Sequence, residues 1–574
     1  MKAFLPFFPL IKKFQSYFIG GVLLILLGTT IEIFLPLIIG KTVDAVTAHA
    51  SNGEIFYYGK IFLSLIVLRA IAEAIQGYVI QRTGQKVLHD LRLMVFDKIL
   101  RLPVAYFDAN STGRLMTRLM NDIKSVSELF SASISVLILD TAVIVGTVVA
   151  MLYSSFYLSL WILLTFPIAI YLIFYFGNRL ATAYREVRQN LSQLNSFIGE
   201  NVGAIASIHR LGAEEDRQNG FEERVQKHTD TQFKSVHIFA LSQPVIGFFN
   251  GVSIATLLGL GGYWVIEGKM TLGVLVMFLG YLRNLFQPIR DLIEKYNTFL
   301  SSYVSLERIN QILFEKEENP AGVEIQEMSD SIFLRFDSVN FQYPGRDISV
   351  LKDISFDLQK GKRIAIVGST GSGKSSIIRL ILRFYEPTSG AITLFGEKIS
   401  NLALNSYRSV FGFVPQEVYV FHGSIRENLT LGRLEISDES LIKISKQSGL
   451  WKVIENRGGL NFETLEGGGN LSMGEKQLLC LTRVLVLDPK VLILDEATSN
   501  IDSNLESQIV TAIETSLVGR TSIIIAHRLS TIMRCDEILV MENGQIAERG
   551  TFTQLRSQNG LFEKFCKIYD STPA

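Results

Sequence analysis

Residues 367 to 376 read Val-Gly-Ser-Thr-Gly-Ser-Gly-Lys-Ser-Ser, and this stretch decides the fold of the half of the chain that contains it. It follows a strand-like apolar run, Arg363-Ile-Ala-Ile-Val367, and precedes an amphipathic helical pattern over Ile377 to Phe384. A glycine-rich turn that opens a helix directs several backbone N–H groups at one point, which suits a polyanionic phosphate. Lys374 adds a point charge for the terminal phosphates, and the Ser375 hydroxyl can reach a magnesium ion. The stretch therefore predicts a nucleoside triphosphate site in an α/β domain.

Two further segments of the same half carry groups suited to phosphate chemistry. Val491-Leu-Ile-Leu-Asp-Glu496 reads as a buried strand ending in two carboxylates. Asp495 is placed to hold magnesium and Glu496 to polarise an attacking water, although a solvated acidic turn would give the same pattern. Leu471-Ser-Met-Gly-Glu475 opens a predicted helix and could bind a second anion. By itself this last pattern is also ordinary helix capping.

The composition divides the chain into two halves of different character. Its 574 residues are 48% hydrophobic and 19% charged, and the long apolar runs fall before residue 300. Lysine plus arginine equals aspartate plus glutamate at 55 each, so the charge balance indicates no nucleic-acid partner. The three cysteines, Cys480, Cys535 and Cys566, form no metal or disulfide pattern. They all lie in the second half, which fits a reducing, cytosolic setting.

The apolar runs of the first half are long enough to cross a bilayer, which takes roughly 20 residues per helix. They lie at about 18–40, 58–80, 131–153, 156–178, 239–266 and 270–298. The preceding stretch, Met1 to Phe18, is expected to lie on the membrane surface with its lysines at the headgroups. The predicted organisation is a transmembrane domain over 1–305, a charged linker over 306–331 and a nucleotide-binding domain over 332–574.

Charge in the loops predicts the orientation of the chain. The segments 81–130 and 179–237 are long and rich in cations, whereas 45–57, 154–156 and 267–269 are short and nearly free of them. The positive-inside rule then places the long loops, the N-terminus and the second half in the cytosol. We therefore expect a multi-pass protein of the inner (plasma) membrane.

The two long loops have helical periodicity and should extend the spans into the cytosol. Their turning points are Tyr106-Phe-Asp-Ala-Asn-Ser-Thr-Gly-Arg114 and Arg210-Leu-Gly-Ala-Glu-Glu215. Each turning point has two interpretations, an ordinary polar helix reversal or a docking element for the nucleotide-binding domain.

Several polar residues fall at membrane depth, where charged groups normally face a bundle interior or a wet cavity. Arg69 and Glu73 share one helical face, and pairing with each other is the favoured explanation. Asp140 and Arg283 have no local partner, so they either form a structural pair or line a polar cavity. Further members of this polar set are Glu32, Asn284 and Gln287. The phenylalanines of the spans are expected to face lipid or the core; they are Phe166, Phe248, Phe249, Phe278 and Phe286.

In their order along the chain, these motifs resemble those of the ABC transporter superfamily, in the form of a half-exporter with six spans fused to one nucleotide-binding domain. The resemblance covers essentially the whole chain. It implies a domain-swapped type of six-helix bundle, a dimer that binds ATP and Mg²⁺, and a Walker A loop at the phosphate-binding stretch. The expected fold is thus an α-helical membrane bundle plus an α/β P-loop nucleotide-binding domain that carries a helical insertion around 420–490. The implied nucleotide-binding positions there are Gly368, Ser369, Thr370, Gly371, Ser372, Gly373, Lys374, Ser375 and Ser376.

The resemblance also assigns roles before the signature segment. It implies that Tyr343 stacks on adenine and that Gln416, in Phe413-Val-Pro-Gln416, senses magnesium and touches the membrane domain. Asp495 matches the Walker B carboxylate, so that Ser375, Gln416 and Asp495 are the expected magnesium positions. Glu496 matches the catalytic base.

Three more segments match in order. Leu471–Glu475, which we call the signature segment, occupies the family's signature position and would bring Ser472 and Gly474 to the nucleotide. Ser499-Asn-Ile-Asp502 matches the D-loop, with Asp502 at the nucleotide. His527, in Ile525-Ala-His-Arg528, matches the switch histidine that contacts the γ-phosphate. The turning points at 106–114 and 210–215 then resemble the family's coupling helices.

The signature segment departs from the family's usual Leu-Ser-Gly-Gly-Gln at Met473 and Glu475. In this family each signature serves the nucleotide bound by the partner subunit. A Met side chain should crowd that phosphate where glycine permits close approach, and Glu475 brings a negative charge toward it. The combination resembles the catalytically complete subunit of heterodimeric exporters, and the Ser-Asn-Ile-Asp D-loop resembles that group too. A heterodimer with a second half-transporter is therefore expected, and a homodimer is the alternative.

The sequence as a whole predicts ATP-driven export by alternating access. The alternative from another class is an ATP-gated channel or regulator, which Glu496 and His527 disfavour because such proteins can lose hydrolysis at little cost. A soluble ATPase acting on DNA is excluded by the spans. The substrate stays open among amphipathic drugs, lipids or lipid-linked glycans, and peptides. No peptidase-like segment precedes the spans, which disfavours export coupled to leader cleavage.

Overall fold

The structure, a computed structural model, describes residues 7–129, 134–325, 332–433, 435–495, 503–525 and 529–570. The chain forms two compact units. The helical unit comprises Met1–Arg101 and Ser111–Glu315, and the α/β unit comprises Leu102–Asn110 and Lys316–Ala574.

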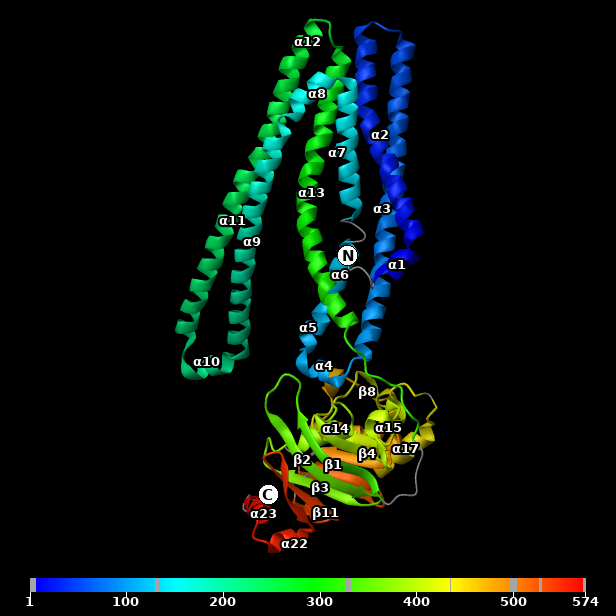
Figure 1. Cartoon of the computed structure of the whole chain (residues 1–574), viewed down its shortest axis with the longest axis vertical. Coiled ribbons are helices and arrows are strands. Elements are labelled where there is room, and N and C mark those ends of the chain that lie inside the picture. The colour runs from blue at the N-terminus through cyan, green and yellow to red at the C-terminus, as the bar shows by residue number, and fades with distance from the viewer. Residues whose placement is uncertain are drawn as a thin grey trace. The chain divides into compact units, whose positions relative to one another are not determined.

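The helical unit confirms the predicted membrane bundle. Six helical stretches of the described residues are long and apolar enough to cross a membrane (Figure 1). They are built from α2 (Gln15–Thr47), α3 (Asn52–Leu100), α7 (Ile134–Ser154), α8 (Phe156–Leu163) with α9 (Phe166–Gly203), α11 (Glu214–Thr256) with α12 (Gly262–Ile266), and α13 (Leu272–Leu313). Residues 131–133 of the third predicted span lie outside the described residues.

The helices extend well past the spans, as their periodicity predicted. Helix α3 has 49 residues, which corresponds to a length of about 70 Å, more than twice a hydrocarbon core of roughly 30 Å. Figure 1 shows α9 and α11 side by side and joined at their far ends by α10 (Ile205–Leu211). Gly212 ends α10 at a positive φ of 61°, a conformation that glycine adopts without strain.

Two features at the ends of the helical unit refine the sequence-based description. Helix α1 (Phe8–Lys13) precedes α2, and Lys13 Nζ lies 2.6 Å from Asp90 Oδ2 of α3. At the other end α13 continues to Leu313, so residues 306–313 of the expected linker are helical. The boundary between the two units falls after Glu315.

The α/β unit is built on a six-stranded sheet with the order β12-β11-β3-β10-β9-β6. Its strands are β12 (Gln545–Gly550), β11 (Glu537–Glu542), β3 (Arg363–Gly368), β10 (Thr521–Ile525), β9 (Val491–Asp495) and β6 (Phe411–Val414). All neighbours pair in parallel except β12, which pairs antiparallel with β11. A second, antiparallel sheet has the order β2-β1-β4-β5 and consists of β2 (Ser349–Gln359), β1 (Ile332–Gln342), β4 (Ser389–Leu394) and β5 (Glu397–Lys398).

The apolar strands of the larger sheet are buried on both faces. Along β3, Ile364 and Ile366 pack into one hydrophobic cluster, while Ala365 and Val367 pack into the other. Alternate residues of a strand point to opposite faces, so a continuous apolar run is what a sheet covered on both sides requires. This explains why the strand that precedes the phosphate-binding stretch has no polar alternation.

The predicted helical insertion near 420–490 is present. It contains α16 (Ile425–Thr430), α17 (Asp438–Gln447), α18 (Leu450–Ile454) and α19 (Met473–Val486). Helix α19 packs against α16, α17 and α18. The observed architecture is thus a six-span helical bundle with long extensions plus an α/β domain with a helical subdomain, as the sequence predicted.

Candidate functional site

The carboxyl ends of four parallel strands gather the predicted site segments at one edge of the larger sheet. Strand β3 leads into the phosphate-binding stretch, β9 ends at Asp495, and β6 ends two residues before Gln416. Residues pair in register across β6, β9, β10 and β3. Ligands of open α/β sheets bind at this edge, so the topology brings Asp495 close to a loop that lies more than 100 residues before it in the chain.

Glycines give the phosphate-binding loop its shape. Gly368, Gly371 and Gly373 have φ angles of 151°, 83° and 106°. A Cβ on Gly368 would lie 2.3 Å from the Met541 carbonyl oxygen, and one on Gly373 would lie 2.6 Å from a Leu351 methyl carbon. Positive φ and close backbone approach both exclude larger residues at these two positions. The loop is therefore held in a tight turn at the start of α14 (Lys374–Ile381).

Lys374 lies inside this turn and fastens it. Lys374 is buried, with only 8% of its surface exposed. Its Nζ donates to the carbonyl oxygens of Gly368 and Ser369 at 2.9 Å each. Ser369, Thr370, Gly371 and Ser375 are exposed, whereas the Ser372 hydroxyl is buried without a partner. The loop thus presents an exposed rim around a buried ammonium group, which suits a terminal phosphate.

Tyr343, the predicted adenine-stacking residue, lies against this loop. Its hydroxyl is 3.0 Å from the hydroxyl of the buried Ser376. Its ring packs edge to face with Phe341 and Tyr385, with centroids 4.7 and 5.0 Å apart. The Arg379 guanidinium lies 5.8 Å from the ring centroid. The structure therefore places Tyr343 beside the nucleotide loop, in contact with an aromatic and cationic cluster.

The groups expected to hold magnesium offer only oxygen ligands. Burial raises the pKa of Asp495 above its ordinary value of 3.8, and the positive charges of Lys374 and Arg379 act in the opposite direction. Ser375 and Gln416 are exposed. Among the described residues no three acidic, histidine or cysteine side chains cluster as a metal site of their own. A carboxylate, a hydroxyl and an amide fit Mg²⁺, which prefers oxygen and commonly completes its shell with water and phosphate.

Several predicted residues lie outside the described residues. These are Glu496, the D-loop from Ser499 to Asp502, and His527. The strands that lead to two of them are described: Ile525 of β10 is paired with Asp495 of β9. The chain therefore leaves the sheet toward Glu496 and toward His527 from neighbouring strands.

The signature segment caps helix α19. The Ser472 hydroxyl accepts from the Glu475 N–H, and the Glu475 carboxylate accepts from the Ser472 N–H at 2.8 Å. Arg457 also donates to that carboxylate at 3.0 Å. The negative charge of Glu475 is therefore compensated within the unit, which the sequence alone did not indicate. Gly474 is buried, while Met473 is 50% exposed at the start of the helix.

A half-buried arginine, Arg483, connects α19 to the segment after Gln416. Arg483 donates to the Tyr419 carbonyl oxygen at 3.0 Å and to the Asn428 carbonyl oxygen at 2.8 Å. Burial lowers the pKa of Arg483 from its ordinary value, yet these carbonyl acceptors satisfy the guanidinium. Hydrogen bonds of Arg483 thus join the segment that follows Gln416 to the helix that carries the signature.

The first predicted docking element is a short helix that packs in the α/β unit. Helix α4 (Val104–Ala109) belongs to this unit by its contacts, and its Asp108 carboxylate accepts from Arg379 at 2.8 Å and from the Tyr385 hydroxyl at 2.6 Å. Burial and the bond to Asp108 raise the pKa of Tyr385 to about 12. Because Arg379 and Tyr385 also contact Tyr343, α4 is one interaction away from the predicted adenine position. The docking interpretation of this turning point is therefore favoured over a plain helix reversal.

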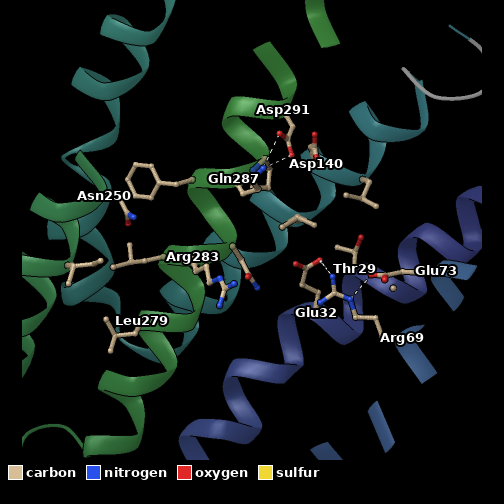
Figure 2. A pocket seen from close by; sticks show the side chains of 18 of the residues that line it. Thr29, Glu32, Arg69, Glu73, Asp140, Asn250, Leu279, Arg283, Gln287 and Asp291 are labelled. Carbon is tan, nitrogen blue, oxygen red and sulfur yellow. Dashed lines mark hydrogen bonds and ion pairs between the residues drawn. The ribbon is translucent and has the colours of Figure 1, made fainter. Parts of the chain in front are cut away.

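A second polar site lies within the helical unit. It is a cavity of about 960 Å³ lined by residues of α2, α3, α7, α11 and α13 (Figure 2). Arg69 contacts Glu73 at 2.7 Å and Glu32 at 3.5 Å, which confirms the expected pairing and adds a second acid. Asp140 and Arg283 both line the cavity, and these two described residues form no ion pair with each other. The polar-cavity interpretation thus holds for them, and the structural pair does not.

Other residues of this cavity were not identified from the sequence. They are Thr29, Gln76, Asn250 and Asp291. Periodicity shows which residues share a face of one helix, but not which faces of five helices meet. Of the phenylalanines expected in core or lipid, Phe166, Phe249, Phe278 and Phe286 are buried, and Phe248 is 65% exposed.

Comparisons with known proteins agree with both units. Residues 18–289 match the ABC transporter transmembrane region, and residues 351–499 match the ABC transporter domain. The uncharacterized ABC transporter ATP-binding protein YknV of Bacillus subtilis (strain 168) is 33% identical over 96% of this chain and 91% of its own length. A Staphylococcus aureus (strain bovine RF122 / ET3-1) protein named as a multidrug export ATP-binding/permease protein is 31% identical over 99% of both chains.

A solved structure shows the same architecture over nearly the whole chain. It is that of a bacterial Atm1-family ABC exporter with ATP bound, with a TM-score of 0.80, 26% identity, and coverage of 98% of this chain and 99% of that one. Half-transporters of this family work as dimers, and they couple ATP hydrolysis to transport. From its six spans, its nucleotide loop at the carboxyl edge of a parallel sheet and these similarities, we conclude that the chain belongs to the ABC transporter family, as an ATP-hydrolysing half-transporter of the exporter type.

Proposed function

We propose that this chain is the catalytically complete half of a heterodimeric exporter, with a different half-transporter as its partner. The observation that carries the proposal is Met473, which is half-exposed at the start of α19 where the family has glycine. A side chain there extends from the helix N-terminus into the space that a partner's phosphate would occupy. Glu475 is not the defect, because its charge is compensated by Arg457.

At the chain's own site the residues are assigned as follows. The backbone N–H groups from Gly368 to Gly373 and the Lys374 ammonium group hold the β- and γ-phosphates, and Tyr343 stacks on adenine. Ser375, Gln416 and Asp495 hold Mg²⁺, which when bound neutralises phosphate charge. Glu496 orients and polarises the attacking water, and His527 contacts the γ-phosphate.

Across the dimer, Ser472, Gly474 and Asp502 act on the nucleotide bound by the partner. ATP then favours the closed dimer because it contacts both subunits only in that state. Closure moves the docking elements and turns the cavity outward, and hydrolysis resets it. The substrate is amphipathic, and the chain lies in the plasma membrane with its α/β unit in the cytosol, as the cation-rich loops indicate.

The homodimer is the second candidate, and one observation favours it. The reciprocal Ser472–Glu475 capping box is intact, so the N-terminus of α19 keeps the geometry of an anion site despite the sequence change. Two moderately impaired sites in a homodimer would then still turn over ATP.

ATP turnover by the chain purified alone in lipid, beside its Glu496→Gln variant, decides between the two candidates. Both proteins are first shown to bind ATP. Binding without turnover supports the heterodimer, because the missing signature must come from a partner. Turnover that the variant loses shows a working homodimer and contradicts the proposed partner. Equal turnover in both proteins overturns the assignment of Glu496 as the base.

A further inference from the structure

The cavity of the helical unit contains buried oxygen atoms that have no partner. Asp140 is 3% exposed and Thr29 is 5% exposed, and neither Asp140 Oδ2 nor Thr29 Oγ1 has a hydrogen-bond partner. Asn250 Oδ1 is likewise buried and unpartnered. Buried polar atoms are rarely left unsatisfied, because desolvation without a hydrogen bond is costly. Two of these three atoms are pure acceptors and the hydroxyl can also accept, so each of them could take a hydrogen bond from a bound ligand.

The net charge of the lining residues also favours a positively charged ligand. Four carboxylates and two guanidinium groups line the cavity, and with all of them ionised the lining carries a net charge of −2; the six residues are Glu32, Glu73, Asp140, Asp291, Arg69 and Arg283. Arg69 is engaged by Glu32 and Glu73. Asp291 accepts from the Gln287 amide at 3.2 Å. Lys295 lies one turn further along α13 and does not line the cavity.

The carboxylates are arranged so that one ligand could reach two of them. Figure 2 shows Asp140 in the same part of the cavity as Gln287 and Asp291, away from the group formed by Glu32, Arg69 and Glu73. Arg283 lies below Gln287 in the figure, on the side away from Glu73. A cation at Asp140 would thus be drawn by Asp291 as well and would be separated from the fixed charge of Arg69.

An apolar site adjoins the same helices. A cavity of about 360 Å³ is lined only by apolar side chains of α7, α8, α9 and α13, among them Val148, Phe166, Leu285 and Ile289. Helices α7 and α13 contribute to both cavities, with Asp140 and Gln287 on one side and Ile144 and Ile289 on the other. A molecule with one cationic end and one apolar end would find a matching environment for each.

We propose that the polar cavity binds the transported molecule and selects amphipathic amines whose protonated nitrogen carries N–H donors, with Asp140 as the main recognising group. The proposal deepens the proposed export function and rests on it. A primary ammonium group supplies N–H donors for the Asp140 carboxylate and the neighbouring Asp291 carboxylate, and a positive charge for the acidic lining. A trimethylammonium group supplies the charge without the donors, so it would leave these oxygens unsatisfied. A carboxylate would meet the net negative charge.

The test uses three probes on one naphthylbutyl scaffold, ending in a primary ammonium, a trimethylammonium or a carboxylate group. Binding to the full chain in lipid nanodiscs is measured by fluorescence without ATP, and partition into empty nanodiscs is subtracted. We expect the primary ammonium probe to bind at least tenfold more tightly than the other two. Because ATP is absent, a chain that needs a partner for turnover still gives a readout, so failure of the proposed heterodimer does not mimic failure of this proposal.

Variants identify the recognising group. Asp140→Asn keeps the shape of the side chain and should weaken the primary ammonium probe at least tenfold. The control Asp97→Asn changes an exposed carboxylate that pairs with Arg101 and should have no effect. If Asp140→Asn does not fold, Asp291→Asn removes the neighbouring negative charge with little change in volume and should weaken the probe about threefold.

Three results would overturn the proposal. Equal affinity for the primary ammonium and trimethylammonium probes would show that the cavity does not recognise N–H donors. Tighter binding of the carboxylate probe would show that Arg283 dominates the cavity. Binding of no probe above empty nanodiscs would show that the cavity is not a site for such molecules.

Discussion

The nucleotide site and the membrane cavity are both polar sites, but they are assembled differently. The nucleotide site uses the ends of adjacent parallel strands, and each of its main residues lies within a few residues of a strand end. The membrane cavity takes its polar residues from the middle of five helices. Lys374 hydrogen-bonds its own loop, while Asp140 has a carboxylate oxygen without a partner.

This difference bears on what each site can recognise. A loop that folds on itself fixes one geometry, which suits a ligand such as ATP that is always the same. A cavity bounded by separate helices changes shape when the helices move, and its acceptors can be satisfied by different donors. Specificity in the nucleotide site therefore depends on the local backbone. Specificity in the membrane cavity depends on the charge and the hydrogen-bond donors of the ligand.

The largest expected effect tests the self-contained site. Lys374→Ala removes the ammonium group that fastens the loop and faces the terminal phosphates, so ATP turnover should fall at least about 100-fold. Probe binding to the membrane cavity should be unchanged. The matched control is Lys362→Ala, which changes an exposed lysine of the same unit that pairs with Asp536. A variant that keeps a tenth of the turnover would contradict the assigned role.

The next effect tests whether the two regions communicate through α4. Asp108→Ala removes the acceptor shared by Arg379 and Tyr385, so stimulation of ATP turnover by a bound amine should fall about fivefold. Asp97→Ala is the control, because Asp97 lies on the exposed surface of α3.

The pH dependence sharpens this prediction. The fold raises the pKa of Tyr385 to about 12, so the protonated hydroxyl is favoured and its bond to Asp108 is lost only as the pH rises toward that value. The difference between Asp108→Ala and the unmodified chain should therefore stay constant from pH 7 to 9. A difference that disappears within this window would show that another group carries the coupling.

A smaller effect separates the two arginines of the cavity. Arg69→Leu leaves Glu32 and Glu73 without their cation, so the thermal midpoint in lipid should fall by about 5 °C. Arg283→Leu removes a guanidinium that is exposed to the cavity, and the midpoint should change by less than about 2 °C. Equal shifts would mean that Arg283 has a structural role that its surroundings do not show.

The smallest expected effect concerns the signature segment. In the homodimer, which is the second candidate, Met473→Gly should raise ATP turnover about twofold to threefold, since it removes the side chain at the N-terminus of α19. Met473→Ala serves as a check on helix stability. If Glu475→Gln raises turnover and Met473→Gly does not, charge rather than bulk is the obstacle, despite the pairing with Arg457.

Sequence patterns predicted the parts of each region that depend on local spacing. The six spans and the helical extensions appear where hydropathy and periodicity placed them. The Arg69–Glu73 pair could be predicted from the sequence because the two residues are four apart on one helix. The Asp108–Arg379 contact was not, because its members are 271 residues apart. The Glu475–Arg457 pair also depends on how the turns before α19 fold back.

By itself, the sequence determined that the chain binds ATP and crosses a membrane. Both conclusions depend on patterns that span no more than about 20 consecutive residues. One is a glycine-rich turn between a strand and a helix, and the other is an apolar run long enough to cross a bilayer. Only the tertiary structure decided that Asp140 and Arg283 line one cavity without pairing, and that Glu475 is neutralised. Charge compensation depends on which side chains meet in space, and helix packing and chain reversal, rather than spacing along the chain, bring them together.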